Sequence, residues 1–224
     1  MSTIMKNTTV KGFGFVLLLT IFSVTAMGQE QQTPSETGIN AKFGFKAGVN
    51  FSNLYNINVD DNNMRLGFNV GVFSKIPISK GVSLQPELLY TTKGSKLKYD
   101  NFILGSGEYR FNLNYLELPV LAVFNLGKNF NIHLGGYAAY LTNTNITDAN
   151  DDGTINEIAV LNASDFNRWD AGLVGGLGFD ISNLTIGARY NYGLVNIGKK
   201  NNISSQLISD SKNSVLSVYL GIGL

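Results

Sequence analysis

A run of acidic and amide residues near position 150 carries the sharpest chemical motif in the chain, DANDDGTINE over residues 148–157. Oxygen ligands at alternate positions, followed by a glycine for a sharp turn, are what a hard cation such as calcium needs. The twelfth position of the calcium-loop pattern is Ala159 instead of a bidentate Glu, so Glu157 or Asp165 would have to substitute. The segment predicts a candidate calcium site, and the alternative is a solvated loop rich in Asp and Asn. Its ligands would be Asp148, Asn150, Asp152 and Glu157.

Two other groups could carry chemistry. Glu87 and Glu117 are candidates for an acid/base carboxylate pair. Basic residues also fall on the polar faces of the predicted strands, however, and this favours ion pairs with a structural role. His133 is the single histidine, so the chain cannot form a cluster of histidines for a transition metal or a proton relay. His133 follows a short turn and is predicted to be a structural inward-facing residue. We therefore predict that the protein is not an enzyme.

The elements that must position these residues are strands, because apolar residues recur at every second position. Eight segments show this alternation, with an apolar face and a polar face in each. Their approximate ranges are 43–51, 66–72, 82–90, 116–124, 130–140, 169–181, 184–194 and 216–224.

The connections between these segments alternate in length. Short turns are predicted at 77–81, 127–129 and 182–183, and long loops at 53–63, 100–109, 143–167 and 198–211. Aromatic residues fall at both ends of the apolar faces, as two lipid–water interfaces select. The sequence thus predicts an all-β fold, an eight-stranded antiparallel up-and-down transmembrane β-barrel of the outer-membrane type; the alternative is a soluble β-barrel or sandwich. The predicted aromatic girdles are Phe43, Phe124, Phe130 and Phe179, and Phe51, Tyr90, Tyr140, Trp169 and Tyr192.

The polar faces place charged residues inside this barrel. Eight strands enclose an interior just wide enough for side chains to fill, so opposite charges there should pair. The charged residues expected in the lumen are Lys46, Arg65, Lys75, Glu87, Glu117, Asp170, Asp180 and Arg189.

The N-terminal region has the order of a secretory signal peptide: basic residues, an apolar run over 13–26 and small residues before Gln29. We expect a signal peptide over 1–28, a flexible periplasmic lead-in over 29–41 and the barrel domain over 42–224. Without cysteine, the chain can carry neither a disulfide nor a lipidated N-terminal Cys. The part after residue 28 has 15 basic and 16 acidic side chains, a charge of −1, which gives no electrostatic footprint for nucleic acid.

Four ordered motifs resemble the PorT-like outer-membrane β-barrel domain of Bacteroidota. They are FGFKAGVNFSN over 43–53, SLQPELLY over 83–90, NYLELP over 114–119 and GARYNYGL over 187–194. The resemblance covers about 42–224, and it implies location in the cell outer membrane after export. One branch of that family takes part in a protein-secretion apparatus, while the C-terminal Leu224 departs from the Phe or Trp of many such barrels.

These observations predict a non-enzymatic outer-membrane barrel with a structural, adhesive or envelope-complex role. Its expected partners are outer-membrane lipid and other envelope proteins. The alternatives are a narrow channel or transporter for a small solute and, from a third class, a lipid-modifying barrel enzyme. No cofactor other than the candidate calcium ion is expected.

Overall fold

The structure is a computed structural model that describes residues 41–55, 62–101, 105–150, 155–157, 166–198 and 211–224. The expected signal peptide, and all of the lead-in except Ala41, lie outside the described residues, and these segments remain predictions. Within the described ranges, no helix combines the length and the apolar character needed to cross a membrane.

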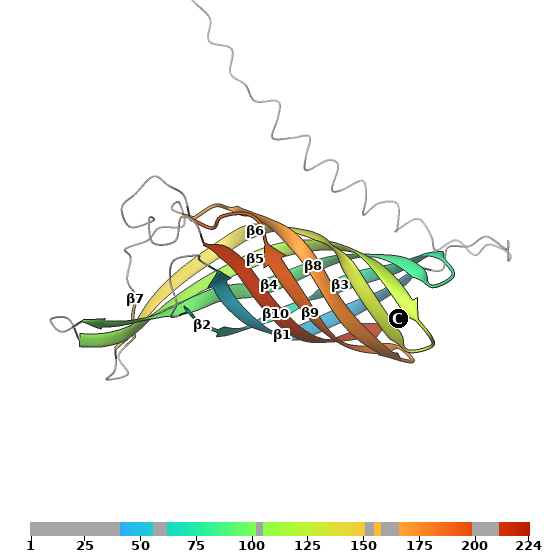
Figure 1. The fold of residues 1–224 in the computed structure, drawn as a ribbon, viewed down its shortest axis with the longest axis horizontal. Helices are drawn as coiled ribbons and strands as arrows, with labels where there is room; N and C mark the ends of the chain where they lie inside the picture. Colours follow the sequence, from blue (N-terminus) through green and yellow to red (C-terminus); the bar gives the residue numbers. More distant parts are fainter. Residues whose placement is uncertain (1–40, 56–61, 102–104, 151–154, 158–165, 199–210) are drawn as a thin grey trace, which may run out of the picture. The chain divides into compact units, whose positions relative to one another are not determined.

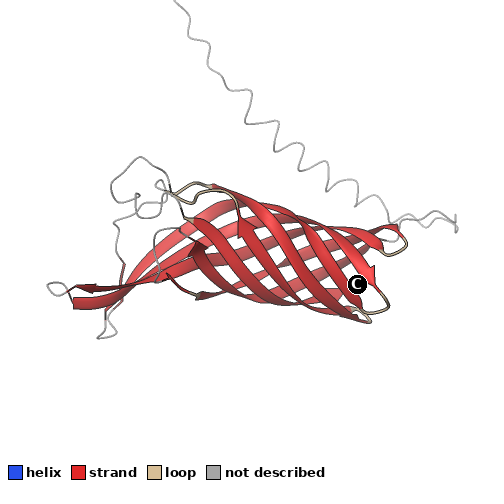
Figure 2. Ribbon diagram, viewed as in Figure 1, coloured by secondary structure: helices blue, strands red, loops and turns tan. Residues whose placement is uncertain are grey.

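The described chain forms strands because β-branched and aromatic residues alternate with polar ones along it. Ten strands form one sheet (Figures 1 and 2). Their bounds are β1 Lys42–Tyr55, β2 Asn62–Asn63, β3 Arg65–Ser79, β4 Val82–Asn101, β5 Gly105–Leu126, β6 Phe130–Asn150, β7 Ile155–Glu157, β8 Trp169–Ile181, β9 Leu184–Gly193 and β10 Lys212–Gly223.

Eight of the ten strands close a barrel. Each pairs antiparallel with its two neighbours in the order β1, β3, β4, β5, β6, β8, β9, β10, and β10 pairs with β1 to complete the ring. The two short strands are side branches, since β2 pairs with β4 and β7 pairs with β6. The predicted eight-stranded up-and-down barrel is confirmed.

Short turns connect the strands at one end of the barrel. They fall at 80–81, 127–129 and 182–183, and the turn glycines Gly81 and Gly127 have φ angles of 91° and 77°. Ser182 also has a positive φ, 54°, in the two-residue turn between β8 and β9. The strands β1 and β10 begin and end at this same end of the barrel, where Figure 1 marks the C-terminus.

At the other end of the barrel, three strands extend further than the sequence predicted. The predicted loop over 100–109 is wrong, because β4 continues to Asn101 and β5 begins at Gly105 in paired register. Likewise, β6 continues to Asn150, inside the predicted loop over 143–167. These strand ends were missed because the outward apolar series does not continue into them. In β5 the sequence still alternates over 109–115, but its apolar residues fall on the odd-numbered face, whereas over 116–124 they fall on the even-numbered face.

The two faces of the barrel wall have opposite character. Outward side chains are apolar and exposed, for example Leu220 at 52% and Ile186 at 43%, whereas the inward Lys46 and Glu87 are each 3% exposed. An apolar exterior around a polar interior is the arrangement that a bilayer requires. Tyr192, the ninth predicted girdle residue, is only half-buried. The other eight are exposed: Phe43, Phe51, Tyr90, Phe124, Phe130, Tyr140, Trp169 and Phe179.

Candidate functional site in the barrel lumen

The first cluster in the lumen is centred on the carboxylate of Glu87 from β4. Lys46 from β1 donates to its Oε1 at 2.9 Å, and Arg189 from β9 donates through two nitrogens, each at 2.8 Å. Gln85 donates to the same Oε1 at 2.7 Å. The ammonium of Lys46 also lies 3.7 Å from the centre of the Tyr219 ring. Two cations and one anion give this cluster, Lys46–Glu87–Arg189, a net charge of +1.

The second cluster is centred on the ammonium of Lys93, from further along β4. Lys93 lies 2.6 Å from Glu117 Oε2 and 3.4 Å from Asp170 Oδ2. Tyr137 and Asn213 also donate to Asp170 Oδ2, at 3.1 and 2.8 Å. One cation and two anions give the cluster Lys93–Glu117–Asp170 a net charge of −1.

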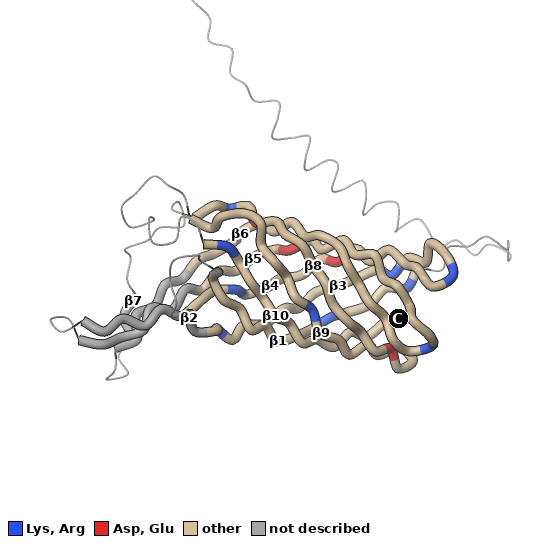
Figure 3. Tube along the Cα trace, in the orientation of Figure 1, with Lys and Arg blue, Asp and Glu red and all other residues tan. Residues whose placement is uncertain are grey.

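The two clusters neutralise each other along the lumen. Asn191 lies next but one to Arg189 on β9 and donates to Glu117 Oε1 at 2.9 Å, which connects the clusters through one strand. Figure 3 shows that Lys, Arg, Asp and Glu positions occur along the barrel strands as well as at their ends. A cavity of about 10 Å³ lies among Lys46, Glu117 and Arg189, which is about the space for one water molecule. The charges thus fill the lumen between them.

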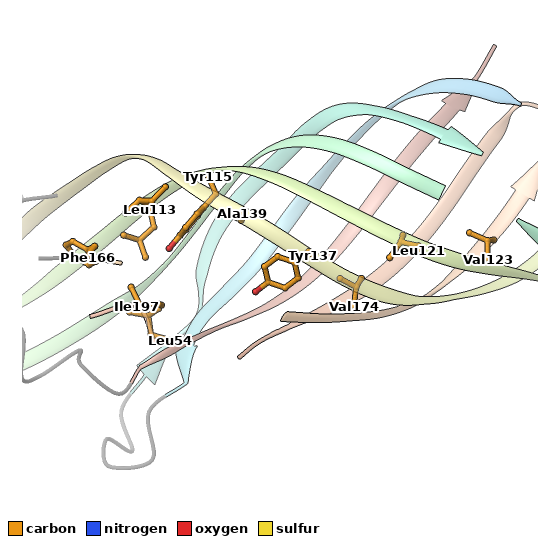
Figure 4. Close-up of a cluster of buried hydrophobic side chains, with 11 residues drawn as sticks. Leu54, Leu113, Tyr115, Leu121, Val123, Tyr137, Ala139, Phe166, Val174 and Ile197 are labelled. Atoms are coloured by element: carbon orange, nitrogen blue, oxygen red, sulfur yellow. The ribbon is translucent and has the colours of Figure 1, made fainter. Parts of the chain in front are cut away.

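Both ends of the lumen are also occupied by side chains. At the short-turn end, Lys75 pairs with Asp180 at 3.2 Å beside a cavity of about 30 Å³, which is also lined by Phe73. At the other end, Phe166 and Ile197 are 0% and 2% exposed. The backbone holds the two segments together, because Asn167 N donates to Ile197 O at 2.7 Å and Phe166 forms an antiparallel bridge with Gly198. They pack in the apolar cluster of Figure 4, whose other members at this end include Leu54, Leu113 and Tyr115.

The candidate catalytic residues are held by structural contacts. Glu87 and Glu117 belong to different clusters and bond to different cations, and both are at most 3% exposed. His133 is 2% exposed, and its Nε2 accepts from Arg189 Nε at 3.5 Å. That contact leaves the proton on Nδ1, which faces Asn131 Oδ1 at 3.4 Å. The arrangement ties each of these groups to a protein partner.

The inward positions of Lys46, Glu87, Glu117, Asp170 and Arg189 are confirmed by their burial. Sequence reasoning missed Lys93, which is 0% exposed and centres the second cluster. The signal was present, since Lys93 continues the odd-numbered inward series of β4 past the point where the apolar pattern ends at Tyr90. Tyr115 and Tyr137, which face the ammonium of Lys93, were missed in the same way.

The structure does not describe the side chains of the four candidate calcium ligands. Asp152 lies outside the described residues, and the side chains of Asp148, Asn150 and Glu157 are likewise not described. The backbone of the segment is a hairpin in which Asp148 pairs with Asn156 and Thr147 with Glu157. Among the residues that the structure describes, no three His, Cys, Asp or Glu side chains gather into a metal site. The calcium site remains a prediction.

Comparisons with known proteins agree with the barrel. The family model for the outer membrane protein β-barrel domain matches residues 28–198. No curated protein sequence matches the chain. Among solved structures, Ail, the attachment invasion locus protein of Yersinia pestis, is 14% identical, with 82% of this chain and 99% of that chain covered and a TM-score of 0.44. Neisserial surface protein A is also 14% identical, with coverages of 82% and 98% and a TM-score of 0.46. Likeness at this level says nothing about what this chain binds.

Proposed function

Since the chain belongs to the outer membrane protein β-barrel domain family and therefore resides in the outer membrane, we propose that it is a non-enzymatic barrel with a structural, adhesive or envelope-complex role. In this proposal, the protein acts through the side of the barrel that carries the long connections, which faces the cell exterior in outer-membrane barrels.

The observation that carries the proposal is the filled lumen. Eight strands leave room for side chains and not for an aqueous channel. Here the lumen holds two charged clusters, and the cavities beside them measure about 10 and 30 Å³. A solute would have to break several buried ion pairs to pass, so transport is disfavoured.

The long strands on one side of the barrel support a role outside the membrane. A strand needs about 9–11 residues to span a bilayer, and β9 and β10 have 10 and 12. In contrast, β4, β5 and β6 have 20, 22 and 21 residues. They form a ribbon that runs past the ends of the other strands (Figure 1). A paired ribbon that leaves the membrane is a suitable surface for another envelope component.

We also propose that the chain is a PorT-like member of this family. The support is the set of four motifs given above, which falls on β1, β4, β5 and β9. Partners would then be other envelope proteins, including those of a protein-secretion apparatus.

The channel alternative is tested by conductance. We expect no steady current from the purified barrel in planar bilayers, because the Lys93–Glu117–Asp170 cluster blocks the lumen. Reproducible currents whose ion selectivity changes in Glu117→Gln would refute the closed-lumen proposal.

The complex-forming role is tested by shortening the ribbon. Joining Lys96 to Arg110, which face each other in the β4–β5 register, through an Asn-Gly turn removes the tip and keeps a hairpin connection. Envelope proteins that co-purify with the wild-type barrel from detergent-solubilised outer membrane should be lost from this variant. Retention of the same proteins would contradict a role for the ribbon tip.

A further inference from the structure

The mouth of the lumen at the short-turn end carries an excess of positive charge. The two central clusters sum to zero, and the Lys75–Asp180 pair beside the mouth is neutral as well. Lys42 adds one further cation at the rim, directly opposite Lys75 in the register of β1 and β3. Like charges at opposed positions of a sheet destabilise each other. Among the residues that the structure describes, no carboxylate forms an ion pair with Lys42.

A cavity of about 30 Å³ lies just inside this mouth. A buried water needs roughly 10–15 Å³ of such space, so the cavity has room for two waters or for one monatomic ion somewhat larger than water. Two of the side chains in its wall, Lys46 and Asn131, are each only 3% exposed. The polar groups that decide what the cavity can hold are those of Lys46, Lys75, Gln85, Asn131, Asp180 and Thr185.

The carboxylate in the cavity wall is already engaged by protein donors. Asp180 Oδ2 accepts from Lys75 at 3.2 Å and from Asn131 at 3.1 Å, and its Oδ1 accepts from Thr185 at 2.6 Å. The nearby carboxylate of Glu87 accepts from three other side chains. Neither carboxylate therefore requires a hydrogen bond from a molecule or ion in the cavity.

Hydrogen-bond donors, in contrast, remain in the cavity wall. An ammonium group has three N–H bonds and a side-chain amide has two. In the described contacts, Lys75 uses two of its three, and Gln85 and Asn131 each use one of their two. A small cavity with surplus donors favours a guest that only accepts hydrogen bonds, whereas water also has to donate. Two ammonium groups in the wall favour a guest with negative charge.

We propose that this cavity binds a monatomic, monovalent anion of the halide class, for which chloride is the probe. The anion lies between the ammonium groups of Lys46 and Lys75 and accepts hydrogen bonds from the amides of Gln85 and Asn131. Its charge compensates the excess at the mouth that Lys42 creates. Since the site exists only in the folded barrel, chloride binding stabilises the fold. The site goes beyond the proposed envelope role and does not depend on it.

The test is chlorine nuclear magnetic resonance of the purified barrel in an uncharged detergent, with sodium gluconate as the balancing salt. The barrel should broaden the chloride line saturably, and bromide should remove the extra width by competing for the cavity. Sulfate should not remove it, because a polyatomic dianion does not fit a cavity of about 30 Å³. In urea unfolding, chloride should raise the midpoint relative to gluconate at equal ionic strength.

Two variants assign the signal to the cavity. Lys75→Gln should weaken chloride binding about tenfold, since a charge-assisted hydrogen bond is lost. Gly221→Ala keeps every charge and adds a methyl group to the cavity wall. Its Cβ would lie 3.4 Å from Phe73 and 3.7 Å from Thr185, which are ordinary contacts, so the variant should fold and bind chloride more weakly. Lys128→Gln is the matched control, because Lys128 is an exposed cation in a turn at the same end and does not line the cavity.

The Lys128→Gln barrel should bind chloride as the wild type does. Broadening that sulfate removes as well as bromide does would overturn the assignment, because the anion would then lie at the open rim instead of in the cavity. Absence of saturable broadening would overturn it as well. So would unchanged binding in Gly221→Ala, and this variant carries the test if Lys75→Gln does not fold.

Discussion

The substitution Glu87→Gln tests whether the lumen clusters stabilise the barrel as their geometry implies. Among the residues that the structure describes, Glu87 is the one anion that forms an ion pair with both Lys46 and Arg189, at 2.9 and 2.8 Å. Gln is nearly the same size as Glu, so the change removes charge and leaves the packing in place. It leaves two cations buried, at 3% and 4% exposure, without the carboxylate that neutralises them.

The expected loss in the free energy of unfolding is about 3–5 kcal/mol, the cost of removing one partner from a buried ion pair. The Lys75–Asp180 pair provides the comparison, because its side chains are 21% and 26% exposed. Lys75→Gln should cost at most about 1 kcal/mol, since water screens that pair. The difference between the two variants compares a buried carboxylate shared by two cations with a single, partly exposed ion pair.

The measurement is urea unfolding of the barrel reconstituted in phospholipid vesicles, followed by the fluorescence of Trp169 and by the gel shift between folded and heat-unfolded forms. The double variant Lys46→Met with Glu87→Gln removes one of the stranded cations and should lose less than the sum of the two single losses. If Glu87→Gln lost no more stability than Lys75→Gln, the clusters would not be the stabilising element described here.

Three further predictions concern the lipid-facing surface, the glycine packing in the barrel wall and the acidic segment. Ile186→Arg should cost roughly 2–4 kcal/mol in vesicles if this exposed position lies near the bilayer midplane, whereas Ile186→Val should be nearly neutral; equal stability of the two would refute the outward assignment. Gly176→Ala should cost about 1–3 kcal/mol in urea unfolding, since its Cβ would lie 2.4 Å from His133 Nε2, while Gly136→Ala, with 3.3 Å to its nearest atom, should be tolerated. For the acidic segment, calorimetry should detect calcium binding at roughly 10⁻⁴–10⁻³ M that is lost in Asp152→Ala, and absence of heat at millimolar calcium would exclude the site.

The sequence predicted the strand ring and the inward or outward assignment of many of its residues. This worked because a strand has a period of two, so a single apolar residue such as Ile186 fixes the face of its neighbours. It could not predict which residues meet across the lumen. Glu87 and Arg189 are 102 positions apart, and their contact depends on the stagger of the strands around the barrel, which no local pattern encodes.

The ends of the long strands were missed for a different physical reason. Lipid requires apolar residues on the outward face of a strand, and strand ends outside the membrane are no longer under that constraint. The outward apolar series therefore stops there, even where the sequence still alternates on the other face, as it does over 109–115 in β5. The cation Lys93 lies at this transition, where the inward face continues after the outward apolar face has ended. Reading the two faces of β4 separately, instead of ending the strand at Tyr90, would have placed Lys93 in the lumen.

A surface groove of about 410 Å³ lies at the edge of the ribbon, lined by residues of β3, β4 and β5. This groove and the ribbon both result from the unequal lengths of the strands. The ribbon of β4, β5 and β6 leaves the barrel at both of its edges, from β3 after Thr91 and from β8 after Tyr140. At the β8 edge, the chain before β8 continues the wall, because Leu141 N donates to Arg168 O at 2.7 Å. At the β3 edge, the side chains of Asn50, Arg65 and Thr92 make the connection, and side chains leave more space than a backbone ladder does. A ribbon that extends beyond its neighbours therefore opens a groove at the edge where side chains replace the ladder, and this edge lies at the membrane surface.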